Sequence, residues 1–595
     1  MKERICFYEN IKKIMPFILS FLAVLGIKGL LNIMVLEPVT DNSFLYSIIF
    51  LMYIFIFLKI QTNSKKVNIF LVLFSAILSL ILVWGSQLEF YGDIIWSCTT
   101  FIKIGTLIIS LYPAVNFIYA FLSNVKSEKQ FFVNSKKMFL YTFIVIFFFD
   151  ILVFLALYPG VYGYDAGFQI MQMLEKGIEI TANFSVLYSF LLAHLVKLGK
   201  VVFDSYEIGF AFYCLLQMLF LSYVATKIVL FCSNRFPKRS IYFMNVLFFS
   251  LFPLYTVMSV SAAQDSLFAG IFCLIIINIT KSVEDDSYWQ NKWNYISLGI
   301  LVFLLCAIRN NGFYSIIFFI PFLFFSPKEN RYKYLIVVTI PLVAFKIYSG
   351  PVFNLMGIQK GNAIREMLSV PSQQFARVYN YSHDSLSKKE IEELNKFYPL
   401  IQNFQYYNNR QCIADPAKAA LDGEYTKENI ADYVSLWTRV GVKNPEEYVE
   451  AFLLNSLGVW YPNKNYYDER MYHPYIEYDM LDAHKWNSKY ISIKRYSKFH
   501  TYERILNYVV KENNWEKIPV ISSMFTAGTY FLVFAYLFLL TIFKKNFKYI
   551  LPLSIILGLY MTVFFAPVAL FRYLFPIIMI SPLMVNLIIY QKGDY

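Results

Sequence analysis

The chain has 595 residues, of which 58% are hydrophobic and only 16% are charged, and its formal net charge is +13. This balance excludes an ordinary soluble domain, and repeated apolar runs of about 20 residues indicate a protein that crosses a membrane many times. The positive charge does not indicate a nucleic-acid partner, because Lys and Arg gather in short loops between the apolar runs and no RNA-binding motif is present.

Fourteen apolar segments predict an all-α polytopic membrane protein with fourteen spans. The first apolar run is too long for a cleaved signal peptide and lacks a small-residue cleavage site, so we expect a retained span. The predicted spans are 14–36, 44–60, 67–86, 95–123, 138–157, 207–232, 241–258, 265–282, 294–308, 312–327, 333–350, 519–543, 549–566 and 571–590.

Basic loops predict the orientation of the chain. Clusters of Lys and Arg follow five even-numbered spans, on the same side as the basic N-terminus. Because cytoplasmic loops carry an excess of Lys and Arg, we expect that side, with the N-terminus, to be cytoplasmic. The clusters are Lys65 and Lys66; Lys126, Lys129, Lys136 and Lys137; Arg235, Lys238 and Arg239; Lys328, Arg331 and Lys333; and Lys544, Lys545 and Lys548.

The segment 184–196 is apolar enough to resemble a further span. It has only 13 residues, and His194, Lys197 and Lys200 interrupt its continuation. Runs of this length are more often interfacial or re-entrant, and counting this one as a span would turn every later basic loop outward. We therefore expect it to lie on the outer membrane surface.

These patterns divide the chain into four parts. They are an N-terminal four-span extension (1–137), a membrane core with an outer loop at 158–206 (138–350), an extracytoplasmic domain (351–518) and a C-terminal three-span bundle (519–595).

The polar region 351–518 is predicted to be mostly helical. Segments 387–398 and 445–460 alternate charged and apolar residues at helical spacing, and Pro445 suits a first helical turn. Asp415–Pro416 predicts a turn. Cys412 is the only cysteine in the region, so an internal disulfide is excluded, and no metal-type spacing occurs in the chain.

Asp165 follows the fifth span directly, in the stretch YPGVYGYDAGFQ. Asp165, Gln169 and Gln172 are spaced i, i+4 and i+7, so they share one face of a short amphipathic helix suited to the interface. One interpretation makes Asp165 a catalytic base, with Tyr164, Gln169 and Gln172 as substrate-binding residues. The other makes it a solvated aspartate that starts a helix.

Asp265 is predicted at the outer mouth of the eighth span. It either caps that helix, since it precedes an apolar run, or joins Asp165 as a second catalytic acid on the same face of the membrane.

Two arginines are predicted at outer span ends, against the positive-inside bias. Arg309, beside Asn310 and Asn311, ends the ninth span, and Arg572 starts the fourteenth. A buried or interfacial arginine needs an anionic partner, which is either a structural carboxylate, lipid headgroups or the phosphate of a bound lipid substrate. The last interpretation makes Arg309, Asn310, Asn311 and Arg572 phosphate-binding residues.

Other candidates are weaker. Arg365 and Gln373–Gln374 follow span eleven and either bind substrate or connect the polar region to the membrane core. The acidic patch 284–286 falls in a predicted cytoplasmic loop, where we expect it to be solvated. The five histidines show no ligand spacing and are interpreted as structural: His194, His383, His473, His484 and His500.

Five sequence elements occur in order along most of the chain after residue 140. They are YPGVYGYDAGFQIMQ at 158–172, AAQDSLF at 262–268, RNNG at 309–312, REMLSVPSQQFARV at 365–378 and RYLFP at 572–576. With these elements the chain resembles the polytopic GT-C glycosyltransferases, and more closely an uncharacterised bacterial branch akin to protein mannosyltransferases. The first four spans look like an addition outside the resemblance.

The resemblance implies a polyprenyl-phosphate-sugar donor, transfer on the outer membrane face and an acidic residue in the first outer loop that serves as base. Asp165 occupies that place, and Asp265 matches a second acidic residue. Relatives often have a His-Pro pair where this chain has Phe184–Ser185, so the chain departs from their pattern at a position that bears on donor or acceptor identity. Several GT-C enzymes bind a divalent cation near the acids, but the branch suggests no required metal.

The leading hypothesis is therefore an inverting glycosyltransferase acting on a cell-envelope acceptor from within the lipid bilayer. The alternatives are a transporter or flippase of lipid-linked saccharides, and a membrane scaffold without chemistry of its own. Transporters tend to place polar residues at mid-membrane and to show repeated halves or broken helices, whereas in this sequence we find the ionisable residues near span ends and no paired halves.

Overall fold

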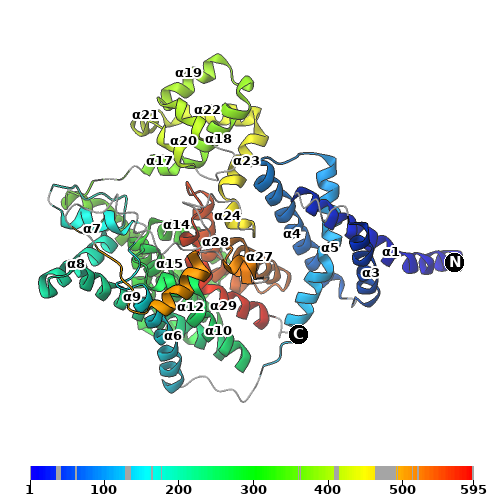
Figure 1. Ribbon diagram of the computed structural model, residues 1–595, viewed down its shortest axis with the longest axis horizontal. Coiled ribbons are helices and arrows are strands. Elements are labelled where there is room, and N and C mark those ends of the chain that lie inside the picture. The colour runs from blue at the N-terminus through cyan, green and yellow to red at the C-terminus, as the bar shows by residue number, and fades with distance from the viewer. Residues whose placement is uncertain are drawn as a thin grey trace.

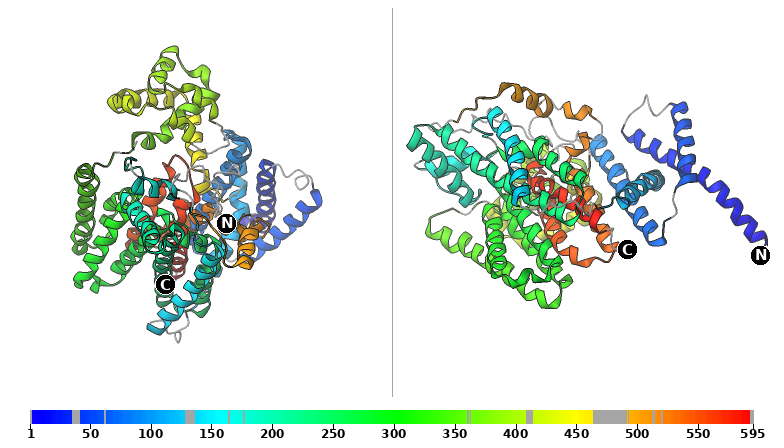
Figure 2. Two further views of the ribbon diagram at one scale, coloured as in Figure 1. Left: turned by 60° about the vertical axis from the view of Figure 1, so that its left-hand side comes forward. Right: turned by 90° about the horizontal axis from the view of Figure 1, so that it is seen from below.

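The computed structural model describes residues 2–34, 42–60, 63–127, 136–162, 165–175, 177–359, 361, 363–407, 414–462, 491, 493–511, 514–518 and 521–591. Within these ranges all regular elements are helices, apart from two isolated bridges, Val161–Ser261 and Thr181–Gln359. The helices form three bodies: an N-terminal group, a large bundle and a smaller polar domain above the bundle (Figures 1 and 2).

Ten helices are long and apolar enough to cross a membrane, or eleven if one bent pair counts as a span. Four more apolar helices have 10–17 residues. The described part of the chain is therefore an all-α polytopic membrane protein, as predicted, while the number fourteen stays a prediction.

In the described residues, four helices form the N-terminal group and pack mainly on one another, at one side of the molecule (Figure 1). Gly26 allows close packing, because a Cβ there would lie 2.6 Å from the backbone nitrogen of Leu107. The Ser110 hydroxyl donates to the Ala23 carbonyl across the same contact (2.6 Å). The helices are α1 (Lys2–Ile33), α3 (Ser43–Lys59), α4 (Lys65–Tyr91) and α5 (Cys98–Ser123).

The bundle surrounds α12 and α29, most of whose residues are buried. Its helices are α6 (Lys136–Ala156), α9 (Tyr206–Arg235), α10 (Arg239–Leu251), α11 (Pro253–Ser259), α12 (Gln264–Glu284), α13 (Lys292–Ile308), α14 (Asn310–Phe319), α15 (Lys328–Ile347), α27 (Ala527–Phe543), α28 (Ile550–Phe564) and α29 (Phe575–Tyr590).

The predicted span 241–258 is a bent pair of helices, because α10 and α11 meet at 54°. Pro253 follows the break as the first residue of α11. Proline lacks the N–H that would continue the hydrogen bonding of α10, and it disfavours a helical conformation in the residue before it.

One end of the bundle is fixed by a buried ion pair. Arg235 contacts Glu284, and the Tyr549 hydroxyl donates to the same carboxylate at 2.7 Å. Only 19% of the Glu284 side chain is exposed. The prediction that Glu284 is solvated was wrong, because the chain brings Arg235 of α9 beside it.

The polar domain has its own core, built around Tyr398, Tyr433 and Leu436. Its helices are α17 (Ala363–Met367), α18 (Ser369–Tyr381), α19 (Lys388–Phe397), α20 (Asp415–Ala419), α21 (Gly423–Glu428), α22 (Ile430–Lys443) and α23 (Pro445–Asn455). Asp415–Pro416 begins α20 rather than forming the predicted turn, because proline is tolerated in a first helical turn. Cys412, His473 and His484 lie outside the described residues.

A capping box begins α19. Ser387 accepts from the Glu390 backbone N–H, and Glu390 accepts from the Ser387 backbone N–H. Burial would raise the pKa of Glu390, but hydrogen bonds from Lys443 and Ser387 lower it to about 2. Glu390 therefore stabilises this domain as a carboxylate.

A second ion cluster joins the polar domain to the N-terminal group. The Arg377 guanidinium lies 2.5 Å from Asp93 and 2.8 Å from Glu447, and it also contacts Glu450. Glu450 in turn accepts from the Ile94 backbone N–H at 3.0 Å. The α4–α5 loop therefore lies on the same side of the bundle as the polar domain.

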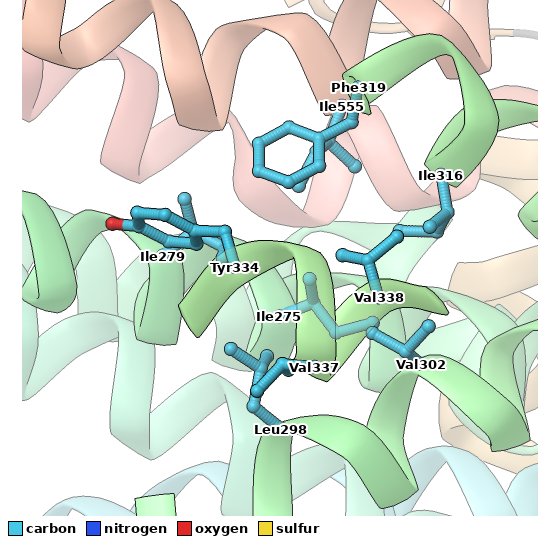
Figure 3. Close-up of a pocket in the computed structure, with 10 residues that line it drawn as sticks. All are labelled: Ile275, Ile279, Leu298, Val302, Ile316, Phe319, Tyr334, Val337, Val338 and Ile555. Atoms are coloured by element: carbon cyan, nitrogen blue, oxygen red, sulfur yellow. The ribbon is translucent and has the colours of Figure 1, made fainter. Parts of the chain in front are cut away.

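A cavity of about 10 Å³ lies between α12, α13, α14, α15 and α28, and Figure 3 shows the side chains that line it. The lining is apolar except for Tyr334, whose hydroxyl is within 2.7 Å of Ser282. A space of this size holds at most a single water molecule, so it is not a ligand site.

Candidate functional site

Four charged residues predicted from the sequence lie together in the folded chain. Arg572 Nη1 lies 3.0 Å from Asp165 Oδ2, and Arg572 Nε lies 3.8 Å from Asp265 Oδ2. Arg309 forms an ion pair with the other Asp265 oxygen. We call Asp165, Asp265, Arg309 and Arg572 the charged cluster.

A short bridge brings the two acids together. The Val161 N–H donates to the Val260 carbonyl (2.9 Å), and the Ala262 N–H donates to the Val161 carbonyl (3.0 Å). Asp165 and Asp265 each follow this bridge by a few residues. Gly160 permits this segment to lie close to α9, since its φ is +132° and a Cβ there would lie 2.4 Å from the Cys214 sulfur.

The arginines come from two helix junctions. Arg309 is the extended residue between α13 and α14, and Arg572 lies in the 3₁₀ turn Phe571–Leu574 that precedes α29. The Tyr573 ring contacts both guanidinium groups, with its centroid 4.1 Å from Cζ of Arg309 and 5.3 Å from Cζ of Arg572. Cation–π contacts of this kind hold a guanidinium in place. The sequence reasoning missed Tyr573, although it stands beside Arg572.

Burial distinguishes the two acids. The Asp265 side chain is 1% exposed and lies between two arginines that are 12% and 11% exposed. A buried carboxylate in that position is held by its cations. The Asp165 side chain is 31% exposed, so Asp165 is the acid that a substrate can reach. Asp265 is therefore positioned to hold both arginines, and Asp165 is the more accessible of the two acids.

Neither acid caps its helix by a side-chain hydrogen bond. Asp165 stands at the N-cap position of α7 (Ala166–Leu174) without such a bond, and its carboxylate contacts Arg572 instead. The N-cap of α12 is Ala263, so Asp265 lies inside the first turn. Both carboxylates are therefore directed toward arginines rather than toward backbone N–H groups.

The two glutamines of α7 are buried beside the cluster. Gln169 donates to the Gln264 side chain at 3.4 Å, next to Asp265 in the sequence. Gln172 donates to Ser189 and accepts from the Thr181 backbone N–H, both at 3.3 Å. Gln172 thereby holds the loop after α7, whereas Gln169 is the closer of the two to the charged cluster.

The remaining predicted residues lie elsewhere. Asn310 is exposed, and the Asn311 amide donates to Thr562 of α28 at 3.0 Å. Arg365 belongs to α17 of the polar domain, where its side chain packs against Gly423. Tyr164 lies outside the described residues. The geometry therefore groups Gln169 with the charged cluster and gives Asn311 a structural contact.

The helix α8 (Val186–Phe203) is longer than the predicted interfacial segment, and its length and composition suffice for a span. Its ends nevertheless lie at one end of the bundle. Ser185, its N-cap, donates to the Ala307 carbonyl (2.8 Å), two residues before Arg309. Near its C-terminus, Gly199 packs against the backbone of Gly209 in the first turn of α9.

The charged cluster gives an independent argument about α8. If α8 crossed the membrane, three crossings would separate Asp165 from Asp265, and the two acids would lie at opposite ends of the bundle. Both acids contact Arg572. The contacts therefore favour the expected placement of α8 along one end of the bundle.

No group of three or more His, Cys, Asp or Glu side chains that could hold a metal ion occurs among the residues that the structure describes. The expectation of no required metal stays a prediction.

Fold and site together define a polytopic helical membrane protein with two acids and two arginines at one end of its bundle. The chain belongs to a family of unknown function, DUF6020, which matches residues 175–593. The match contains Asp265, Arg309 and Arg572 and begins just after α7, so Asp165 precedes it. No curated protein matches the chain, and neither does any solved structure.

Proposed function

We propose that this protein is a membrane glycosyltransferase that moves a sugar from a polyprenyl-phosphate donor to an extracytoplasmic cell-envelope acceptor. The observation that carries the proposal is the contact between Asp165, the exposed acid, and Arg572 within a cluster of two acids and two arginines. In such a cluster a carboxylate that can accept a proton lies within hydrogen-bonding distance of a guanidinium group that can bind a phosphate.

The arginines bind the donor phosphate in this proposal. The cluster is neutral in the absence of substrate, since two carboxylates face two guanidinium groups. A donor phosphate adds negative charge and competes with Asp165 for Arg572. Arg309 and Arg572 are held by Asp265 and Tyr573, so they are already oriented when the phosphate arrives. Binding of the donor thereby frees the Asp165 carboxylate.

The reaction is then a single displacement. The acceptor hydroxyl oxygen attacks the anomeric carbon, and its proton passes to Asp165. The bond between the anomeric carbon and the phosphate oxygen breaks, and the polyprenyl phosphate leaves with that electron pair on its oxygen, where the arginines stabilise the negative charge. Direct attack inverts the anomeric centre. A positioned base contributes about 10²–10⁴-fold to such a rate.

In this proposal the polar domain acts on the acceptor side of the site. The Ala414 N–H donates to the Pro567 carbonyl (2.8 Å), and the Asn455 amide donates to the Ala566 carbonyl (2.7 Å). Both contacts are on the loop that leads to Arg572. With the N-terminus cytoplasmic by its basic loops, this domain and the charged cluster are extracytoplasmic.

The test is transfer from a polyprenyl-phosphate sugar in membranes that contain the full-length chain. Asp165→Asn is expected to reduce transfer by about 10²–10⁴-fold while the protein stays folded. Asp204→Asn is the matched control, because Asp204 is an exposed acid of the same outer loop that pairs only with Lys200 in the described residues. Undiminished transfer by folded Asp165→Asn protein would remove the base role.

One observation favours a second candidate function, transport of a lipid-linked saccharide. The bend between α10 and α11 is a discontinuous helix, and α6 carries the buried Asp150 within its span. Transporters use both features at their substrate sites. Movement of a lipid-linked saccharide across vesicles without any transferred product would support transport over transfer.

A further inference from the structure

Asp150 is a carboxyl group inside a membrane-spanning helix, outside the charged cluster. It lies in α6 and is fully buried. Ser222 of α9 lies 2.8 Å from its Oδ2, and Ser259 of α11 lies 3.0 Å from its Oδ1. Among the described residues no Lys, Arg or His pairs with it. An ionised carboxylate buried without a cation is costly, so the carboxyl needs another means of neutralising its charge.

The hydrogen bonds around Ser259 indicate where that neutralisation comes from. Ser259 has one hydroxyl proton, but its oxygen lies 2.7 Å from the Thr256 carbonyl and 3.0 Å from Asp150. A carbonyl and a carboxylate can only accept. An ionised Asp150 therefore leaves one of these two contacts without a proton, whereas a protonated Asp150 donates to Ser259 while Ser259 donates to Thr256.

We propose that Asp150 binds a proton and is a neutral carboxylic acid in the folded protein, donating to Ser259 and accepting from Ser222. Among the described residues the titratable side chains near this site are tyrosines, which are neutral at ordinary pH: Tyr255 of α11 lies beside Ser222, and Tyr502 of α25 (His500–Leu506) lies near Asp150. The carboxyl oxygens lie at hydrogen-bonding distance from the two hydroxyl oxygens, at 2.8 and 3.0 Å. These distances fit a bound proton, because a metal ion between the oxygens would hold them farther apart.

The proton has a positioning role. Ser259 ends α11, the second half of the bent pair, and the next residues lead to Asp265. Gln217 of α9 donates to the carbonyls of Ser259 and Ser261, each at 2.8 Å. The protonated Asp150 thus ties α6 and α9 to the segment that delivers Asp265 to the charged cluster. Asp150 is a positioning residue and has no contact with substrate in this scheme.

Infrared spectroscopy of the full-length protein in lipid nanodiscs at pH 7 tests the proposal without any activity assay. The difference between wild type and Asp150→Asn is expected to contain the carbonyl band of a protonated carboxyl group that shifts in heavy water. Asp150→Asn is expected to keep the wild-type melting temperature, because its amide also donates to Ser259. A band that is absent, or that appears only in sodium-free buffer, would overturn the proposal.

A second variant keeps the test valid if Asp150→Asn fails to fold. Ser259→Ala removes the acceptor of the proposed proton, so the same band should persist and move to higher frequency. Ser282→Ala is the matched control, since Ser282 is a buried serine of α12 that bonds to Ile279 and Tyr334. An unchanged band in Ser259→Ala would contradict the proposal. Loss of sugar transfer would leave it intact, since the band reports only the proton.

Discussion

Replacing Asp265 by asparagine removes the charge that holds both arginines of the cluster while keeping the shape of the side chain. With Arg572 Nε at 3.8 Å, the Coulomb energy of that pair alone is about 4 kcal/mol at an effective dielectric constant of about 20. Arg309, which lies closer to Asp265 than Arg572 does, also loses its carboxylate partner. Removing one member of a buried pair typically costs about 3–5 kcal/mol, because the remaining charge is left uncompensated. We expect Asp265→Asn to lower the free energy of unfolding by about that amount.

The measurement is reversible unfolding of the full-length protein in mixed detergent micelles, followed by circular dichroism. The double variant with Arg309→Gln separates the pair from other effects, since Arg309→Gln should cost less when Asp265 is already neutral, by about 0.5–3 kcal/mol. Asp204→Asn is the control, because Asp204 is 89% exposed. A loss of less than about 1 kcal/mol in Asp265→Asn, with no coupling to Arg309, would refute the clamping role of Asp265.

Three further outcomes are expected. Gly160→Ala should destabilise the chain and lower transfer, since its Cβ meets the Cys214 sulfur at 2.4 Å and φ is +132°; a melting temperature equal to wild type would contradict the close packing. Because the pKa of Glu390 is about 2 in the folded state against 4.5 ordinarily, the stability it provides should be lost as the pH falls from about 4.5 to about 2. Hydrogen exchange of α19 measures this loss of stability. The loss should be smaller in Glu390→Gln, because glutamine does not titrate. A cysteine that replaces Asp204 should react with an impermeant maleimide on intact cells, whereas one that replaces Lys126 should not. The reverse pattern would show that the predicted orientation of the chain is wrong.

The sequence was sufficient to predict the helical class and the members of the charged cluster. An acid such as Asp165 or an arginine such as Arg572 at the end of an apolar run is conspicuous, and the order of the spans places these ends together. The even number of crossings predicted between Asp165 and Asp265 depends on placing 184–196 along the outer surface, and the contacts of both acids with Arg572 favour that placement.

Other features depend on partners that no local pattern contains. Asp165 and Asp265 have similar surroundings in sequence. Only the burial seen in the structure distinguishes Asp165, which is partly exposed, from Asp265, which is buried between two arginines. Glu284 looks solvated until Arg235 of another helix is beside it. The expectation that ionisable residues lie near span ends was wrong for Asp150, which lies within the apolar run FFFDILVF of α6. Its partners Ser222 and Ser259 lie on two other helices, so no local pattern shows them.

The ion cluster around Arg377 has a consequence for the N-terminal helices. Asp93 and the backbone of Ile94 hold Arg377 and Glu450 of the polar domain, so the α4–α5 loop fixes the tilt of that domain above the bundle. The family match begins only at residue 175, after all four of these helices. A chain without them would keep all four residues of the charged cluster, but the polar domain would then be held only by its contacts with the bundle, such as those at Ala566 and Pro567.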